Sequence, residues 1–113
     1  MPIVYLPAVP MRYDAHNDER IPALDVSGAS DFGDMKTLLN LDRPLLPSEM
    51  PSAINEICTK LKPIQSDDFI VAVGDPVLIA AAVSYGIHKN GVAKMLRWNR
   101  ISKSYQPIEV RLS

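Results

Sequence analysis

The sequence has little cysteine, no long apolar run and almost no net charge. Only one of its 113 residues, Cys58, is a cysteine, which excludes an intrachain disulfide and a cysteine-based zinc site and fits a reducing compartment. The net charge of −1 indicates no nucleic-acid or membrane partner. No apolar run can span a bilayer, and the first residues lack the pattern of a signal peptide. We therefore expect a soluble protein of the cytoplasm.

Catalytic and cofactor motifs are also missing. Gly74 has no second glycine nearby, which excludes the dinucleotide fingerprint and the Walker loop, and no serine lies in a G-x-S-x-G elbow. Cys58 falls on the apolar stripe of a predicted helix, as a small core residue does. The two histidines, His16 and His88, have no orienting partners in the sequence. These absences favour a non-enzymatic role without a cofactor.

What is present indicates one folded domain. The length suits a single domain, and 47% apolar residues is ordinary for a globular protein. Residues 1–30 are predicted to be an extended arm and loop-rich segment, and residues 31–113 the main body. Within the arm, prolines favour an edge strand or extended arm over 2–10, and polar residues favour a loop over 11–21. Residues 22–26 are predicted to form a second short extended piece.

Two helices are predicted before the middle of the chain. The first runs from a cap at Ser30 or Asp31 to about Asn40, because Phe32, Met35, Leu38 and Leu39 fall on one helical face. The second runs from about Ser48 or Pro51 to Leu61. Its apolar stripe, spaced i, i+3, i+4, i+7, consists of Ile54, Ile57, Cys58 and Leu61.

A strand–helix–strand crossover is predicted over residues 69–98. The apolar run 69–73 is typical of a strand covered on both faces. Asp75 is expected to cap a helix that begins at Pro76 and is closed by Asn90-Gly91. A parallel crossover then leads into strand 92–98, which forms an antiparallel hairpin with 105–112. The predicted fold is α+β (or small α/β), a single domain whose mixed sheet carries two further helices.

The helix that begins at Pro76 has few polar positions before Lys89. A helix that is apolar all round needs cover on more than one side. We therefore expect a homo-oligomer.

Charge is divided unevenly along the chain. Residues 1–87 hold twelve acids and six bases, whereas residues 88–113 hold one acid and six bases. Basic and aromatic side chains together suit nucleic acid or an acidic protein surface. Equally, the aromatic residues could be core and the bases solvated, or the basic end could attract the acidic region of a neighbour. The candidate residues are Lys94, Arg97, Trp98, Arg100, Lys103, Tyr105 and Arg111.

Two other sites are weaker candidates. Gly74 and Asp75 lie where a strand meets a helix, a place where α/β proteins bind ligands, although a structural cap is the simpler interpretation. Asp14, His16, Asp18 and Glu19 have donor types that bind divalent metals. Their spacing matches no calcium loop, so a solvated loop is favoured. Asp67 and Asp68 are interpreted as solvated connector residues.

A resemblance to a family follows from two stretches, VAVGDPVLIAAAVSYGIHKNGVAKMLRWNRISKSYQPIEVRL and ALDVSGASDFGDMKTLL. The G-D-P helix start, the basic L-x-W-x-R strand and the Y-x-P return resemble small proteins of marine tailed bacteriophages. The resemblance implies a phage-encoded accessory protein made in the cytoplasm of the bacterial host. No activity is assigned to those proteins, so no functional residue carries over.

The leading functional hypothesis is a non-enzymatic interaction module whose basic C-terminal hairpin binds nucleic acid or an acidic protein. One alternative is a small-molecule or nucleotide-binding protein, with or without catalysis, whose site surrounds Asp75. The other is a purely structural homo-oligomer.

Overall fold

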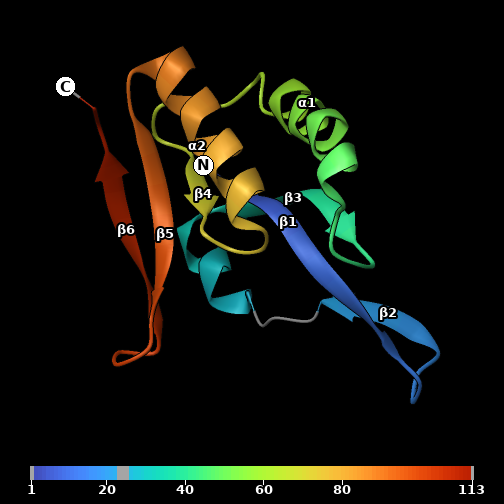
Figure 1. Ribbon diagram of the computed structural model, residues 1–113. Coiled ribbons are helices and arrows are strands. Elements are labelled where there is room, and N and C mark those ends of the chain that lie inside the picture. Colours follow the sequence, from blue (N-terminus) through green and yellow to red (C-terminus); the bar gives the residue numbers. More distant parts are fainter. Residues whose placement is uncertain (1, 23–25, 113) are drawn as a thin grey trace.

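The computed structural model describes residues 2–22 and 26–112, which form six strands and several helices (Figure 1). The elements in chain order are β1 (Ile3–Asp14), β2 (Glu19–Pro22), the 3-10 helix η1 (Ser27–Phe32), β3 (Asp34–Leu41), the 3-10 turn η2 (Pro47–Glu49), α1 (Met50–Lys60), β4 (Phe69–Val71), α2 (Pro76–Asn90), β5 (Ala93–Asn99) and β6 (Ser104–Val110).

The sheet is mixed. Strand β1 pairs in parallel with β3 and with β4, β4 pairs in parallel with β5, and β5 pairs antiparallel with β6. The order is therefore β3-β1-β4-β5-β6, and β2 pairs antiparallel with the far end of β1. The predicted α+β fold, the parallel crossover and the C-terminal hairpin are confirmed.

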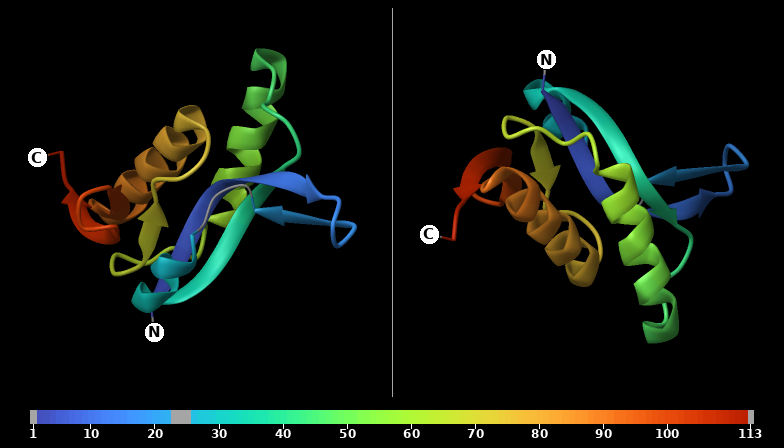
Figure 2. Two further views of the ribbon diagram at one scale, coloured as in Figure 1. Left: turned by 90° about the horizontal axis from the view of Figure 1, so that it is seen from below. Right: turned by 90° about the horizontal axis from the view of Figure 1, so that it is seen from above.

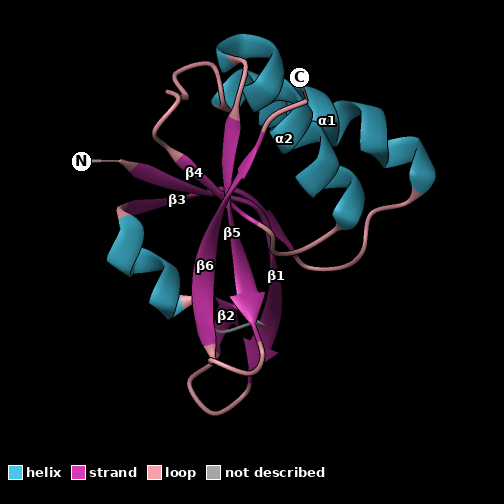
Figure 3. Ribbon diagram, turned by 90° about the vertical axis from the view of Figure 1, so that its left-hand side faces the viewer, coloured by secondary structure: helices cyan, strands magenta, loops and turns pink. Residues whose placement is uncertain are grey.

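Helices cover the two faces of the sheet unequally. Helices α1 and α2 lie on one face and η1 on the other (Figure 3). The core beneath α1 and α2 includes Tyr5, Leu38, Ile57, Ile70 and Leu78. The core beneath η1 includes Val4, Leu6, Val9, Val71 and Leu96.

Residues 2–10 are extended, but the prediction that they form an edge strand or an extended arm is wrong about their position. Strand β1 pairs with β3 along most of its first half and with β4 at Val4 and Tyr5, so its first half lies inside the sheet and is largely buried. Beyond Tyr5 no pairing with β4 is formed. Pro7 and Pro10 therefore lie where one side of the strand has no ladder to complete, and a missing N–H costs little there.

Residues 11–21 form a hairpin and not the predicted loop. The end of β1 pairs with β2 from Met11↔Pro22 to Asp14↔Glu19, and the hairpin projects from the body (Figure 2). A two-stranded ribbon outside the core needs no buried face, so no apolar alternation reveals it. The extended piece predicted over 22–26 lies mostly outside the described residues.

The predicted helix over 31–40 is also wrong. The chain forms η1 and then β3, which pairs with β1 over Ile3↔Asp34 to Pro10↔Leu41. The apolar residues in this stretch fit a short strand as well as a helix, and the parallel ladder offered by β1 decides the outcome. Of the two further helices predicted, only the second is confirmed as α1; the first is replaced by η1 and β3.

The predicted ends of α2 are confirmed. The Asp75 carboxylate accepts a hydrogen bond from the Val77 amide at 2.8 Å, and Pro76 occupies the first helical position. Gly91 closes the helix in the left-handed region at φ 77°, a conformation that suits glycine. This helix is fixed at both ends by local chemistry.

Asp68 is not the solvated connector residue that was predicted. Its side chain is 6% exposed, and its two carboxylate oxygens accept hydrogen bonds from the Ile3 amide at 2.9 Å and the Gln65 amide at 2.8 Å. Burial, together with the charge of Asp68, raises the pKa of the Tyr5 hydroxyl. Asp68 therefore ties the start of β1 to the turn before β4.

Candidate functional site

The structure distributes the seven candidate residues of the C-terminal hairpin over different surfaces. Lys94 and Trp98 share the face that carries Leu96 and η1, because side chains two residues apart point the same way. Arg97 consequently lies on the opposite face. Arg111, beyond the end of β6, forms an ion pair with Glu109 at 2.6 Å. The basic side chains therefore form no single row on the hairpin.

The predicted register of the hairpin is confirmed by its aromatic pair. Trp98 lies opposite Tyr105, and their ring centroids are 5.1 Å apart in an edge-to-face arrangement, a geometry that stabilises cross-strand pairs. Tyr105 packs against the core beneath η1, whereas Trp98 remains 46% exposed. The pair anchors the hairpin and leaves part of the indole at the surface.

Lys94 lies over one aromatic ring. Its ammonium lies 5.8 Å from the centroid of the Phe69 ring, and Phe69 contacts Phe32 edge-to-face at 5.5 Å. A cation over a ring face is attracted by the ring quadrupole. Lys94 is also half-buried, so it is less suited than the other bases to meet a partner.

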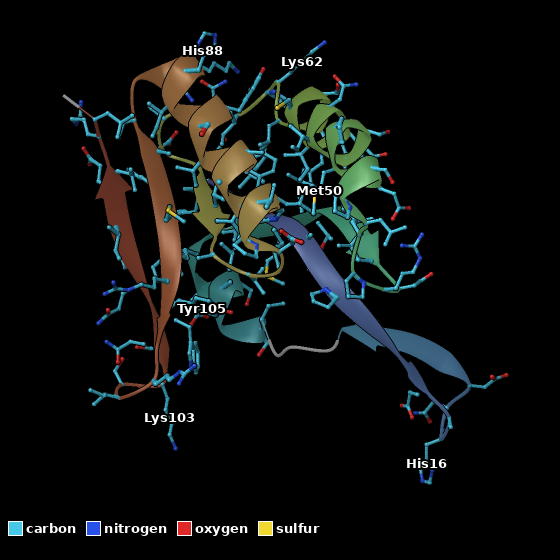
Figure 4. All side chains as sticks on the ribbon, in the orientation of Figure 1. His16, Met50, Lys62, His88, Lys103 and Tyr105 are labelled. Atoms are coloured by element: carbon cyan, nitrogen blue, oxygen red, sulfur yellow. The ribbon has the colours of Figure 1, made fainter. Side chains whose placement is uncertain are left out.

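The remaining bases, Arg100 and Lys103, flank Ile101 in the turn between β5 and β6. We call residues 100–103 the basic turn. Its Ile101 side chain is 95% exposed, and Lys103 points away from the body (Figure 4). A single exposed apolar side chain is ordinary at a protein surface, so the feature that distinguishes Ile101 is the pair of cations that flank it.

The basic turn is held in one conformation by its neighbours. The Asn99 side-chain oxygen accepts hydrogen bonds from the amides of Ile101 at 2.9 Å and Ser102 at 3.0 Å. Lys103 adopts φ 52°, which few residues other than glycine adopt. Strain of this kind persists only where the surroundings impose it, so the backbone of the turn is defined by its own local contacts.

Gly74 and Asp75, the second candidate site, lie where β4 leads into α2. Gly74 has φ 94°, and a Cβ atom there would overlap the Ala8 carbonyl oxygen. Asp75 caps α2. Both residues thus have structural roles, and Asp75 also contributes to a cavity beside them.

That cavity, which we call the acidic hollow, has a volume of about 380 Å³. It lies near the carboxyl ends of the β1–β3 ladder and β4. Its surface is mainly apolar, and the carboxylates of Asp42 and Asp75 border it. The lining residues are Pro10, Leu41, Asp42, Arg43, Pro44 and Asp75.

The one base of the acidic hollow, Arg43, is engaged by Glu49. Two guanidinium nitrogens of Arg43 donate to the two carboxylate oxygens of Glu49, each at 2.8 Å. The hydrogen bond from Arg43 and another from the Leu46 amide lower the pKa of Glu49 to about 2. Glu49 therefore offsets much of the charge of Arg43.

The polar cluster around His16 lies at the end of the projecting hairpin (Figure 4). The Asp14 carboxylate accepts hydrogen bonds from the His16 amide at 3.0 Å and the Asn17 side chain at 2.9 Å, which organises the turn. In the part of the chain that the structure describes, no group of three or more His, Cys, Asp or Glu side chains is placed to hold a metal. His88 lies exposed in the last turn of α2.

Sequence reasoning missed Ile101 and all of the acidic hollow except Asp75. Ile101 has a signal in the sequence: it is a β-branched apolar residue in a turn of polar ones and belongs to no periodic pattern. The strand–helix junction at Asp75 was the only part of the hollow with a signal, because the other lining residues come from two further stretches of the chain.

No described helix is long and apolar enough to cross a membrane. Comparison with curated proteins and with solved structures gives no significant match. The model of one protein family, described as Phage Pam3 gp32-like protein, matches residues 2–112. The expected relation to small phage proteins is thereby confirmed. Because the match spans nearly the whole sequence, the chain belongs to the Phage Pam3 gp32-like protein family.

Proposed function

We propose that this phage-family protein is a non-enzymatic interaction module that binds an acidic protein surface through its basic turn and acts in the cytoplasm of the bacterial host. The observation that carries the proposal is the 95% exposure of Ile101 between Arg100 and Lys103. Interface energy is concentrated in a few residues, among which arginine is enriched, and Arg100 adjoins Ile101.

The turn also meets the requirements for productive docking. Asn99 fixes its backbone, so little conformational entropy is lost when it binds. Trp98, the residue before Asn99, adds an exposed aromatic surface, and tryptophan is enriched among residues that dominate binding energy.

An acidic protein is favoured over nucleic acid. Single-stranded nucleic acid is bound by a row of bases beside aromatic faces that are free to stack. Here Arg97 lies on the face opposite Trp98, and the Trp98 ring already contacts Tyr105. The small hollow beside this pair is lined by one acid, Asp31, and one base, Lys103, so it offers no uniformly basic groove for a phosphate backbone. These features suit a protein surface with acidic and apolar parts.

Binding to poly-glutamate, used as an acidic probe, tests the proposal. The double variant Arg100→Glu/Lys103→Glu should lower the affinity at least about tenfold relative to Lys36→Glu/Lys62→Glu, which changes the net charge equally on other exposed residues. The affinity of the unmodified protein should also fall with salt, since exposed charges are screened. Equal affinity of the two double variants would contradict the role of the turn. A single-stranded DNA probe that binds more tightly, and in a turn-dependent way, would move the assignment to nucleic acid.

A second candidate function is binding of a small molecule in the acidic hollow. Its volume of about 380 Å³ lies within the range of ligand pockets, and it lies near the carboxyl ends of parallel strands, where α/β sheets bind ligands. A thermal-shift screen of nucleotides, amines and metal ions should then find a stabilising compound. Loss of that shift in Pro44→Trp, which narrows the hollow, would place the compound there.

A further inference from the structure

The basic turn and the acidic hollow match each other in polarity and in charge. We infer that the partner of the basic turn is a second copy of this chain, whose acidic hollow receives Ile101. The inference rests on the proposed docking role of the turn and names its partner.

The apolar parts are complementary. Ile101 has no cover in its own chain, whereas the hollow exposes apolar surface from Pro10, Leu41 and Pro44. Inserting an exposed apolar side chain into a pre-existing pocket of another copy removes both surfaces from water.

The charged parts are complementary as well. Arg100 and Lys103 flank the isoleucine, and the lining of the hollow includes two acids, Asp75, which caps α2, and Asp42, which also has an interaction within its own chain. Arg43, the base in the lining, is held by Glu49 through two hydrogen bonds, so its repulsion of the incoming turn is reduced. Opposite charges around an apolar centre steer association and fix its orientation.

The topology allows the contact to be reciprocal. Strands β1, β3, β4 and β5 are parallel, so their carboxyl ends lie along the same edge of the sheet. The hollow lies near the ends of the β1–β3 ladder and of β4, and the basic turn follows β5. A two-fold axis beside this edge therefore lets each copy insert its turn into the hollow of the other. Two-fold dimers are the commonest protein oligomers.

Sedimentation velocity from micromolar to submillimolar concentration, at low salt, measures the self-association. The unmodified protein should form a concentration-dependent dimer. Ile101→Asp should weaken it at least about 30-fold, the loss expected for a central anchor. Leu112→Asp is the matched control, because Leu112 is 78% exposed but lies outside the turn, and it should dimerise normally. A protein that stays monomeric over this range, or equal dimerisation of Ile101→Asp and the unmodified protein, would overturn the inference.

A charge exchange tests the orientation. Arg100→Glu/Lys103→Glu should weaken the dimer, and adding Asp42→Lys to the same chain should restore part of the lost affinity, because every copy then carries both reversed surfaces. Each variant should first show a cooperative thermal transition. No restoration would overturn the pairing of the turn with the hollow.

Cross-linking tests whether Ile101 of one copy lies beside Pro44 of the other. In a Cys58→Ser background, chains carrying Ile101→Cys and chains carrying Pro44→Cys should form a disulfide when mixed, faster than either chain alone. Leu112→Cys mixed with Pro44→Cys should not exceed the rate of random collision. Equal rates of disulfide formation in the Ile101→Cys/Pro44→Cys and Leu112→Cys/Pro44→Cys mixtures would contradict the inference. The proposed function fails separately, when poly-glutamate binding does not depend on the turn, so the two failures can be told apart.

Discussion

Replacing the buried Asp68 carboxylate should destabilise the protein far more than replacing its exposed neighbour Asp67. In Asp68→Asn one side-chain oxygen becomes an NH2 group. This group faces a backbone N–H, either that of Ile3 or that of Gln65, and two donors cannot bond. The other hydrogen bond remains, but its acceptor is then a neutral amide oxygen.

The size of the effect follows from these two bonds. A hydrogen bond to a charged group contributes about 1.5–3 kcal/mol. Losing one and weakening the other should lower the free energy of unfolding by about 2–3 kcal/mol. For a domain of this size, that lowers Tm by roughly 10 °C.

Urea unfolding followed by circular dichroism measures the change. Asp67→Asn is the control and should stay within about 0.5 kcal/mol of the unmodified protein, as exposed substitutions usually do. If the two variants were equally stable, Asp68 would not hold the start of β1, and the reasoning would be refuted.

Three further predictions concern the surroundings of the acidic hollow. Carbon-13 NMR titration should give Glu49 a pKa near 2, and Arg43→Gln should raise that pKa toward its ordinary value. Because the pKa is lower in the folded state, the Arg43–Glu49 pair stabilises the protein at neutral pH. This stabilisation is lost as pH falls from about 4.5 to 2. Asp75→Ala should cost about 1 kcal/mol in chemical denaturation and Asp75→Ser much less, since serine also caps helices; equal costs would argue against the cap. Gly74→Ala should cost at least about 2 kcal/mol, because alanine is strained at φ 94° and its Cβ would overlap Ala8; an unchanged Tm would contradict this.

The second half of the fold was predictable because its signals are local. Asp75 and Pro76 define one end of α2 and Gly91 the other. Trp98 and Tyr105 set the register of the last hairpin by direct cross-strand contact. None of these assignments depends on a distant segment.

The first half of the fold was not predictable because its structure depends on contacts between segments that are distant in sequence. The residues of β3 become a strand because β1 offers them a parallel ladder, and that partner is remote in sequence. From the sequence, Asp68 is predicted to be solvated, because only the folded chain brings the Ile3 amide within hydrogen-bonding distance of its carboxylate. The turn between the last two strands could be located from sequence, but most of the acidic hollow could not, since Pro10, Leu41 and Asp75 meet only in the folded chain.

The two environments of strand β1 have a consequence for local unfolding of the protein. Its first half is buried between β3 and β4, whereas its last residues, 11–14, pair with β2 in a ribbon that projects from the body (Figure 2). One continuous strand thus belongs to two cooperative units. Hydrogen exchange should separate them: amides of β2 should exchange through local fraying, and those of Tyr5 and Leu6 only through global unfolding. The ribbon can then unfold locally or change its conformation without breaking contacts in the core.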